Sequence, residues 1–292
     1  MALRKEGKSL KKYVDKAMVD LPAMPAVVVQ VIEAIEKETV STAMIESHLN
    51  SDPAIAAKLL KVVNSAYFGL PRQVVNTGQA IAILGIQQVR NLVMSVGVIN
   101  ALTSANPKIQ EAQFQFWRHS FGSASCAQAL AVRSRLDRKQ QELAFICALL
   151  HDIGRLFLFT AFFPQYQNVL TEALRRGSPL TEMENKAMGI GHDELGGALA
   201  EKWNFPEQLI QVVKLHESLE GPIEADMLTL ISCVHAADRI SSTEWLGDES
   251  APVWPWNPRA ESILGLEPEE IESLRQTTRD SVEKAAQLLG SL

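Results

Sequence analysis

Cysteine is scarce in this sequence, and the few cysteines are not arranged as a site. Only Cys126, Cys147 and Cys233 occur in 292 residues, far apart and without a C-x-x-C pair. An odd number of isolated cysteines excludes a disulfide framework and a zinc ribbon. We therefore expect three buried thiols, because free cysteine is among the most buried residue types.

Long uncharged apolar runs are also lacking. The longest apolar stretch, residues 145–163, is interrupted by His151, Asp152 and Arg155, whereas a membrane-spanning helix needs roughly 18 to 20 apolar residues. The N-terminus has basic residues without the apolar segment of a secretory signal behind them. With 47% hydrophobic and 21% charged residues, the composition is typical of a folded globular protein. We expect it in the cytoplasm, with no membrane partner.

Positive charge is too sparse for a nucleic-acid-binding face. The net charge is -6 and unevenly spread: residues 1–107 carry 11 Lys+Arg and 8 Asp+Glu, whereas residues 108–292 carry 17 and 26. Six of the basic residues fall within the first 16 positions, which is typical of a solvated leading helix. Nucleic-acid binders show a continuous basic stripe, so we do not expect a nucleic-acid partner.

Apolar residues recur with helical spacing along the chain, and alternating strand patterns hardly occur. The spacing after Pro25 predicts a helix over residues 25–37. Asp52 before Pro53 is an N-cap signal for another helix. Thr77 can cap the next one, and residues 86–102 form a further amphipathic run. We therefore predict an all-α fold with about five helices before residue 103.

The polar segment TSANPKIQ, residues 103–110, is the best internal boundary. We place a helical N-terminal lobe at residues 1–107 and a second helical lobe at residues 108–292.

Thr181 and Glu184 have the spacing of a capping box that opens one helix of this second lobe. The Trp- and Pro-rich segment TEWLGDESAPVWPWNP is expected to be a loop, pinned to the helices by its tryptophans. Those are Trp245, Trp254 and Trp256. The other predicted helices lie near residues 111–135, 139–151, 165–176, 193–203, 206–216, 225–241 and 268–289.

Five of the six histidines lie in the second lobe. His151 and Asp152 are adjacent in ALLHDIGR, at the end of an apolar helix that we expect Gly154 to break. A charge at the end of a buried helix is costly unless it is paired. The residues alone leave two interpretations open: a His–Asp pair that caps the helix, or ligation of a divalent metal by imidazole and carboxylate.

Further motifs accompany this doublet: FWRHS with His119, GIGHDELGG with His192, VVKLHES with His216 and VHAADRI with Asp238. With them the chain resembles the HD superfamily of metal-dependent phosphohydrolases, whose signature is a His, a His-Asp doublet and a distant Asp. The blocks LPAMPAVVVQVIEAI, NSDPAIAAKLLKVVNSAYFG and AIAILGIQQVRNLV make it similar to one branch, the HDOD family of bacterial signalling proteins. The resemblance runs over residues 15–241 and implies an HD-like helical bundle with an additional N-terminal lobe.

The resemblance also implies a metal site. A mixed set of imidazole and carboxylate ligands suits one or two divalent transition ions, Fe, Mn or Zn. Asp152 and Arg155 are the candidates for a catalytic role, whereas His235 lies outside the pattern and is expected to be an ordinary core histidine. The implied metal ligands are His119, His151, Asp152 and Asp238, the mononuclear set, together with His192 and His216, where binuclear enzymes have further histidines.

The chain departs from the HD-GYP branch, which contains cyclic di-guanylate phosphodiesterases. Arg155 replaces a lysine after the doublet, and Glu217 replaces the second histidine of a His-His pair. The following segment, SLEGPIEAD, contains no G-Y-P. We therefore expect no cyclic di-guanylate phosphodiesterase activity.

Two functions stay open at this point. The first is a bacterial regulatory module that acts by binding a signalling protein or a small ligand, because the N-terminal lobe matches HDOD blocks yet holds none of the implied ligands. The alternative is a metal-dependent phosphohydrolase with a phosphoester or nucleotide substrate. In the N-terminal lobe, Asn64 and Ser65 are expected to cap helix backbone, and Tyr67 and Phe68 to pack between the lobes.

Overall fold

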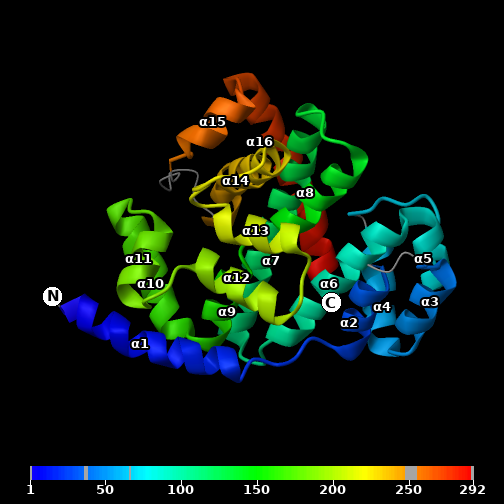
Figure 1. The fold of residues 1–292 in the computed structure, drawn as a ribbon, viewed down its shortest axis with the longest axis horizontal. Helices are drawn as coiled ribbons and strands as arrows, with labels where there is room; N and C mark the ends of the chain where they lie inside the picture. Colours follow the sequence, from blue (N-terminus) through cyan, green and yellow to red (C-terminus); the bar gives the residue numbers. More distant parts are fainter. Residues whose placement is uncertain (1, 36–38, 66, 247–254, 291–292) are drawn as a thin grey trace.

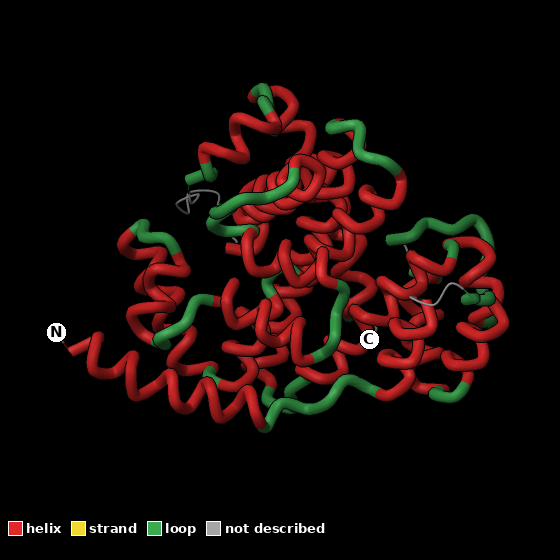
Figure 2. The backbone as a smooth tube through the Cα atoms, in the orientation of Figure 1, coloured by secondary structure: helices red, strands yellow, loops and turns green. Residues whose placement is uncertain are grey.

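The computed structural model describes residues 2–35, 39–65, 67–246 and 255–290. Within these ranges the chain forms helices and connecting loops and no strand, as Figure 2 shows. This confirms the all-α prediction. The first six helices are α1 (Ala2–Val19), α2 (Ala26–Ile35), α3 (Thr42–Asn50), α4 (Pro53–Val63), α5 (Thr77–Leu84) and α6 (Ile86–Leu102).

The second half is built around the long helix α7, which packs against α8, α14 and α16. Figure 1 shows α8, α14 and α16 grouped beside α7. The helices of this half are α7 (Pro107–Arg133), α8 (Arg138–Leu150), α9 (Ile153–Ala161), α10 (Phe163–Arg176), α11 (Leu180–Ala187), α12 (His192–Lys202), α13 (Glu207–Leu215), α14 (Ala225–Leu246), α15 (Pro258–Leu264) and α16 (Pro268–Leu289).

Several helix ends follow the local signals of the sequence. The Asp52 side chain accepts hydrogen bonds from two backbone N–H groups of α4, directly before a proline at the first helical position. Asp137 forms a capping box with Gln140 at the start of α8. Gly177 ends α10 in the left-handed conformation, with φ of 59°. These short-range signals fix where the helices begin and end.

Three expected helix signals were wrong, those at Thr77, Gly154 and Thr181, and α3, α9 and α15 were not predicted at all. The cap of α5 is Asn76, not Thr77, because the Asn76 side chain accepts the Gln79 N–H. Gly154 does not break the helix after Asp152, since it lies inside α9. A glycine is needed there because another backbone passes close by, as described below.

The N-terminal helices α2 to α6 pack mainly on one another, whereas α1 packs against α11 in the second half. Figure 1 shows α1 lying along the second half. Tyr67 packs between the two halves, with its ring centroid 5.0 Å from that of Phe121 and 6.0 Å from that of Phe145. The division at residue 107 stays a prediction.

Other predicted details of the N-terminal helices and the thiols are confirmed. The Asn64 side chain donates to the carbonyl of Leu60 and accepts the N–H of Val74. The Ser65 hydroxyl donates to the carbonyl of Val62. All three cysteines are buried and free.

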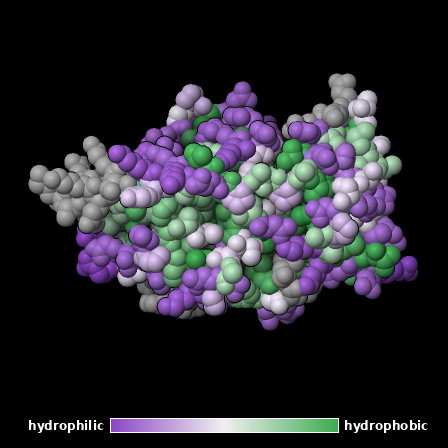
Figure 3. All heavy atoms as spheres, turned by 90° about the horizontal axis from the view of Figure 1, so that it is seen from below, coloured by the Kyte–Doolittle hydropathy of each residue, from purple (hydrophilic) through white to green (hydrophobic). Residues whose placement is uncertain are grey.

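The longest apolar stretch lies in the core, and other apolar residues lie among polar ones on the surface. Residues 138–161 form the one described stretch that is long and apolar enough to cross a membrane, and 94% of its apolar 18-residue segment is buried inside the protein, where the stretch forms α8 and α9. This is the position of a core segment. Hydrophilic and hydrophobic residues are mixed over the face shown in Figure 3, which is usual because apolar atoms contribute over half of a protein surface.

Candidate metal centre

Six predicted ligands from different parts of the chain meet in the core of the second half. His119 comes from the middle of α7 and Asp238 from α14, while His192 begins α12. His151 and Asp152 form the joint between α8 and α9, and His216 follows α13. Each is at most 3% exposed. Packing of α7 on α8 and α14 brings together residues that lie 119 positions apart in sequence.

We call His119, His151, Asp152 and Asp238 the first donor group. One ligand atom of each lies within 4.8 Å of the others. Oδ1 of Asp238 lies 3.1 Å from Nε2 of His119 and 3.4 Å from Nε2 of His151. Oδ2 of Asp152 lies 3.5 Å from the same atom of His151. Two imidazoles and two carboxylates are a ligand set suited to a divalent transition ion.

Asp152, His192 and His216 are the second donor group, and their ligand atoms also lie within 4.8 Å of one another. Oδ1 of Asp152 is 3.2 Å from Nε2 of His192 and 3.5 Å from Nε2 of His216. Oε1 of Glu217 is 3.7 Å and 3.9 Å from these two nitrogens. Asp152 therefore directs one carboxylate oxygen to each donor group.

The second ring nitrogen of each histidine faces an acceptor outside the centre. Nδ1 of His151 and Nδ1 of His216 donate to the backbone carbonyls of Ala148 and Val213, at 2.7 Å and 2.8 Å. Nδ1 of His119 lies 3.4 Å from the carbonyl of Ser241. Such outer partners fix the tautomer and direct the other nitrogen at a metal.

Five donor atoms of the centre make no hydrogen bond, although each is buried: Nε2 of His151, His192 and His216, and Oδ1 of Asp152 and Asp238. An unsatisfied buried polar group costs about 1 to 3 kcal/mol. Five such groups would cost an amount comparable to the whole stability of a domain, about 5 to 15 kcal/mol. Protons or a cation must therefore compensate them, and the donor chemistry fits one or two divalent ions.

Two arginines hold the carboxylates of the centre. Arg155 donates to Oδ2 of Asp152, and Arg239 donates to Oδ2 of Asp238 and to Glu217. Burial alone raises the pKa of Asp152 and of Asp238, but the neighbouring arginines and histidines outweigh it and hold both pKa values well below the usual range. The same balance of burial against Arg239 and the histidines lowers the pKa of Glu217 to about 2. The metal-facing oxygens therefore stay ionised.

Glu184 is a buried residue of the centre that the sequence misassigned. The predicted capping box with Thr181 is wrong, because α11 begins at Leu180 and no side chain caps it. Oε2 of Glu184 instead accepts the backbone N–H of His192 and its Nδ1–H, at 2.8 Å and 2.7 Å. Its Oε1 accepts the hydroxyl of Tyr166. The Glu184 carboxylate therefore binds His192 and Tyr166 and does not cap α11.

Gly154 allows α9 to approach α12 closely enough to bring Asp152 to His192. A Cβ atom at this position would lie 2.0 Å from the carbonyl oxygen of His192 and 2.8 Å from the nitrogen of Gly196. Real Cβ atoms essentially never come within 3.0 Å of another heavy atom. The glycine therefore serves a close backbone contact rather than a helix break.

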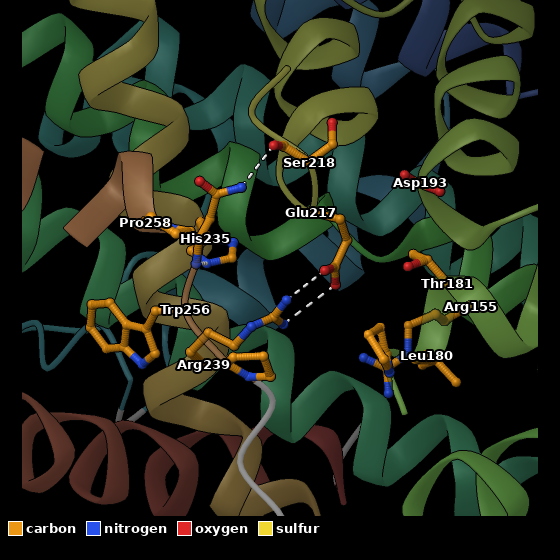
Figure 4. Close-up of a pocket in the computed structure, with 13 residues that line it drawn as sticks. Arg155, Leu180, Thr181, Asp193, Glu217, Ser218, His235, Arg239, Trp256 and Pro258 are labelled. Carbon is orange, nitrogen blue, oxygen red and sulfur yellow. Dashed lines mark hydrogen bonds and ion pairs between the residues drawn. The ribbon is translucent and has the colours of Figure 1, made fainter. Parts of the chain in front are cut away.

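A pocket of about 310 Å³ adjoins the centre. Arg155, Glu217 and Arg239 line it and also contact the donor groups, and Figure 4 shows the ion pair of the last two on its wall. His235 is a buried core histidine, as predicted, held by the carbonyl of His216 and the N–H of Asn257. The remaining lining residues are Pro179, Leu180, Thr181, Asp193, Ser218, Pro255, Trp256, Asn257 and Pro258.

Of the three loop tryptophans, Trp256 packs against the core and also lines this pocket. Trp254 lies outside the described residues, as does the side chain of Trp245. Sequence reasoning missed the places of Glu184, Glu217 and Arg239 at the centre. The position of Glu217 directly after His216 was the one signal that could have pointed to it.

The comparison with protein families agrees with the ordered motifs. The sequence model of the HDOD domain matches residues 21–219. The chain belongs to the HDOD family. An uncharacterized protein of Treponema pallidum (strain Nichols) is 31% identical over 220 residues, which are 75% of this chain and 42% of that protein. The chain thus spans less than half the length of this relative.

Solved structures share the fold of this HDOD protein. A candidate signal transduction protein of Marinobacter aquaeolei VT8 superposes with a TM-score of 0.74 at 18% identity, over 99% of this chain and 66% of that one. A candidate phosphohydrolase of Shewanella amazonensis SB2B gives 0.70 at 20% identity, over 94% and 97%. An HDOD domain protein of unknown function from Geobacter sulfurreducens gives 0.66 at 19% identity, over 97% and 95%.

Proposed function

We propose that this HDOD protein is a metal-dependent phosphohydrolase of bacterial signal transduction that acts in the cytoplasm. The observation that carries the proposal is the convergence of two donor groups on the Asp152 carboxylate, beside a pocket lined by two arginines. Ions held by these residues would lower the pKa of a bound water toward neutrality and polarise a phosphoryl oxygen. Asp152, His151 and Asp238 would hold the first ion with His119, and His192 and His216 would complete the second set.

The pocket side chains suit a phosphorylated ligand. Arg155 and Arg239 are held in place by their ion pairs with the donor carboxylates, so their guanidinium groups are oriented before a ligand arrives. A guanidinium presents its N–H groups in the planar fork that matches phosphate oxygens. Both arginines would orient the phosphoryl group and balance the charge that develops on it.

The geometry shifts the balance between the two functions that the sequence left open. The sequence favoured a regulatory module because the N-terminal lobe matches HDOD blocks yet holds none of the implied ligands. It could not place Glu217 or Arg239 at the centre, nor reveal the pocket. A centre with two donor groups, oriented arginines and an adjoining pocket contains the parts of a hydrolytic site. These observations support the phosphohydrolase as the better proposal.

One observation still favours the regulatory module as a second candidate. Helices α2 to α6 supply no donor to the centre, yet Tyr67 connects this part of the chain to α7 and α8 through its ring contacts. A signalling protein or small ligand bound there would act by shifting the packing of the two halves. In this case metal would be bound without turnover.

Metal analysis and turnover measured on the same variants test the proposal. Protein purified without chelator is analysed for its metal content and then assayed with phosphomonoesters, phosphodiesters and nucleotides. Asp152→Asn removes the negative charge shared by both groups and leaves a single neutral oxygen, so we expect metal loss and at least a 100-fold fall in turnover, since several kcal/mol of transition-state stabilisation are lost. Asp226→Asn, an equal change at an exposed site on α14, should match the wild type.

Folding of each variant is checked by circular dichroism, and His216→Gln serves as a second variant that leaves the pair of Asp152 with Arg155 intact. Wild-type protein that holds metal but turns over none of these substrates would contradict the phosphohydrolase and support the regulatory module. Turnover that survives both site substitutions would place the activity elsewhere.

A further inference from the structure

The four histidines of the centre are not held in the same way. Backbone carbonyls face Nδ1 of His119, His151 and His216. Nδ1 of His192 alone among them donates to a carboxylate, that of Glu184. A carboxylate partner raises the basicity of an imidazole more than a neutral carbonyl does, because it stabilises the positive charge that metal binding places on the ring.

The surroundings of Glu184 strengthen this effect. The residue is completely buried, and the hydrogen bonds of its carboxylate come from the Tyr166 hydroxyl and from the backbone and ring of His192. None of these hydrogen-bond donors carries a permanent charge, although the charge of Arg155 also acts on this carboxylate. An ionised carboxylate in such a place is costly, and a cation on the far side of the His192 ring would lower this cost.

We infer that Glu184, oriented by Tyr166, is a positioning residue that strengthens metal binding at the second donor group and leaves the first unchanged. The inference rests on the metal centre of the proposed function. The hydrogen bonds of Glu184 reach the donor groups through His192, and His192 faces Oδ1 of Asp152, the oxygen of the second donor group. Only the second donor group therefore contains a histidine whose Nδ1 is bound by a carboxylate, and this partner affects the metal affinity of that group alone.

The substitution Glu184→Gln removes the charge and preserves the shape. The amide oxygen can still accept both N–H groups of His192, and the amide NH₂ can donate to the Tyr166 hydroxyl, which turns to accept. Glu182→Gln is the matched control, because it makes the same chemical change on an exposed side of α11. Tyr166→Phe should act in the same direction as Glu184→Gln, with a smaller effect.

Each donor group is measured alone in a background that disables the other. His119→Ala leaves the second group intact, and His216→Ala leaves the first. Metal-free protein is titrated with Co²⁺ against a competing chromophoric chelator, and the absorption of bound Co²⁺ reports the ligand geometry. In the His119→Ala background, Glu184→Gln should weaken binding about 10- to 100-fold, the usual effect of an outer partner. In the His216→Ala background it should change affinity less than about threefold.

Each outcome is informative. Equal weakening in both backgrounds would mean a general structural role and overturn the inference, as would unchanged affinity in the His119→Ala background. Uptake of no ion by the wild type would refute the metal centre, and with it the proposed function. Selective weakening in a protein that turns over no substrate would uphold the inference while the hydrolase proposal fails.

Discussion

The contact between α9 and α12 leads to the sharpest prediction for this fold. Gly154→Ala would place a methyl group 2.0 Å from the carbonyl oxygen of His192. Reaching even the 3.0 Å limit requires these backbones to separate by at least about 1 Å. Neither neighbour can yield by a simple side-chain rotation, because the atoms in the way belong to the backbone.

We expect two effects of Gly154→Ala: a lower free energy of unfolding and weaker metal binding at the second donor group. Overpacking of a core costs typically 1 to 3 kcal/mol, and a clash between two backbones belongs at the upper end, so we expect a loss of about 3 kcal/mol in the free energy of unfolding. Metal ligands must be placed within about 0.2 Å. A shift of His192 by about 1 Å therefore removes a ligand from the second donor group.

Urea denaturation of the metal-free protein measures the first loss, and Co²⁺ titration measures the second. Gly78→Ala is the control, because its new methyl group meets only the flexible end of Glu46 and should leave both quantities nearly unchanged. A Gly154→Ala variant within about 0.5 kcal/mol of wild type, with both ions bound, would refute this account of the contact.

Three further predictions concern other parts of the molecule. Iodoacetamide should label none of the thiols in the native protein at pH 8 and all of them after unfolding, because burial raises the pKa of Cys126 and Cys233 to about 12; rapid native labelling would contradict this. Tyr67→Phe should cost about 1 kcal/mol in urea denaturation, since it removes the 2.6 Å hydrogen bond to the Ser125 hydroxyl and keeps the ring; an unchanged midpoint would show that this bond adds nothing. The metal-loaded protein should not hydrolyse cyclic di-guanylate, because Glu217 stands in place of a histidine and no G-Y-P follows; turnover of that dinucleotide, lost in Asp152→Asn, would overturn the expectation.

The sequence predicts the fold class well because helical periodicity and end signals are local. The Asp52 and Asp137 caps act within four residues, and the structure has both. The six candidate ligands were found through ordered motifs that resemble a family, not through spacing, since no local rule relates His119 to Asp238. Their meeting in space depends on how α7 and α14 pack.

The misassigned residues share a physical cause. Glu184 has the spacing of a capping box, yet its carboxylate faces His192 from another helix. Gly154 has the identity of a helix breaker, yet it is required by a neighbouring backbone. The Glu184 carboxylate can occupy only one position, and its buried tertiary contacts outweigh an exposed local one. Local sequence patterns do not show which residues from distant helices will contact Glu184 or Gly154.

The wide separation of the donors along the chain sets an order of events during folding. His119 and Asp238 bracket 118 intervening residues, and closing a loop of that length costs entropy before these two ligands can meet. The helices must therefore pack before an ion can be held. An ion held there would favour the native state over the unfolded chain by mass action. Resistance to proteolysis should then rise with metal concentration, and metal content would distinguish the folded molecules from the unfolded ones.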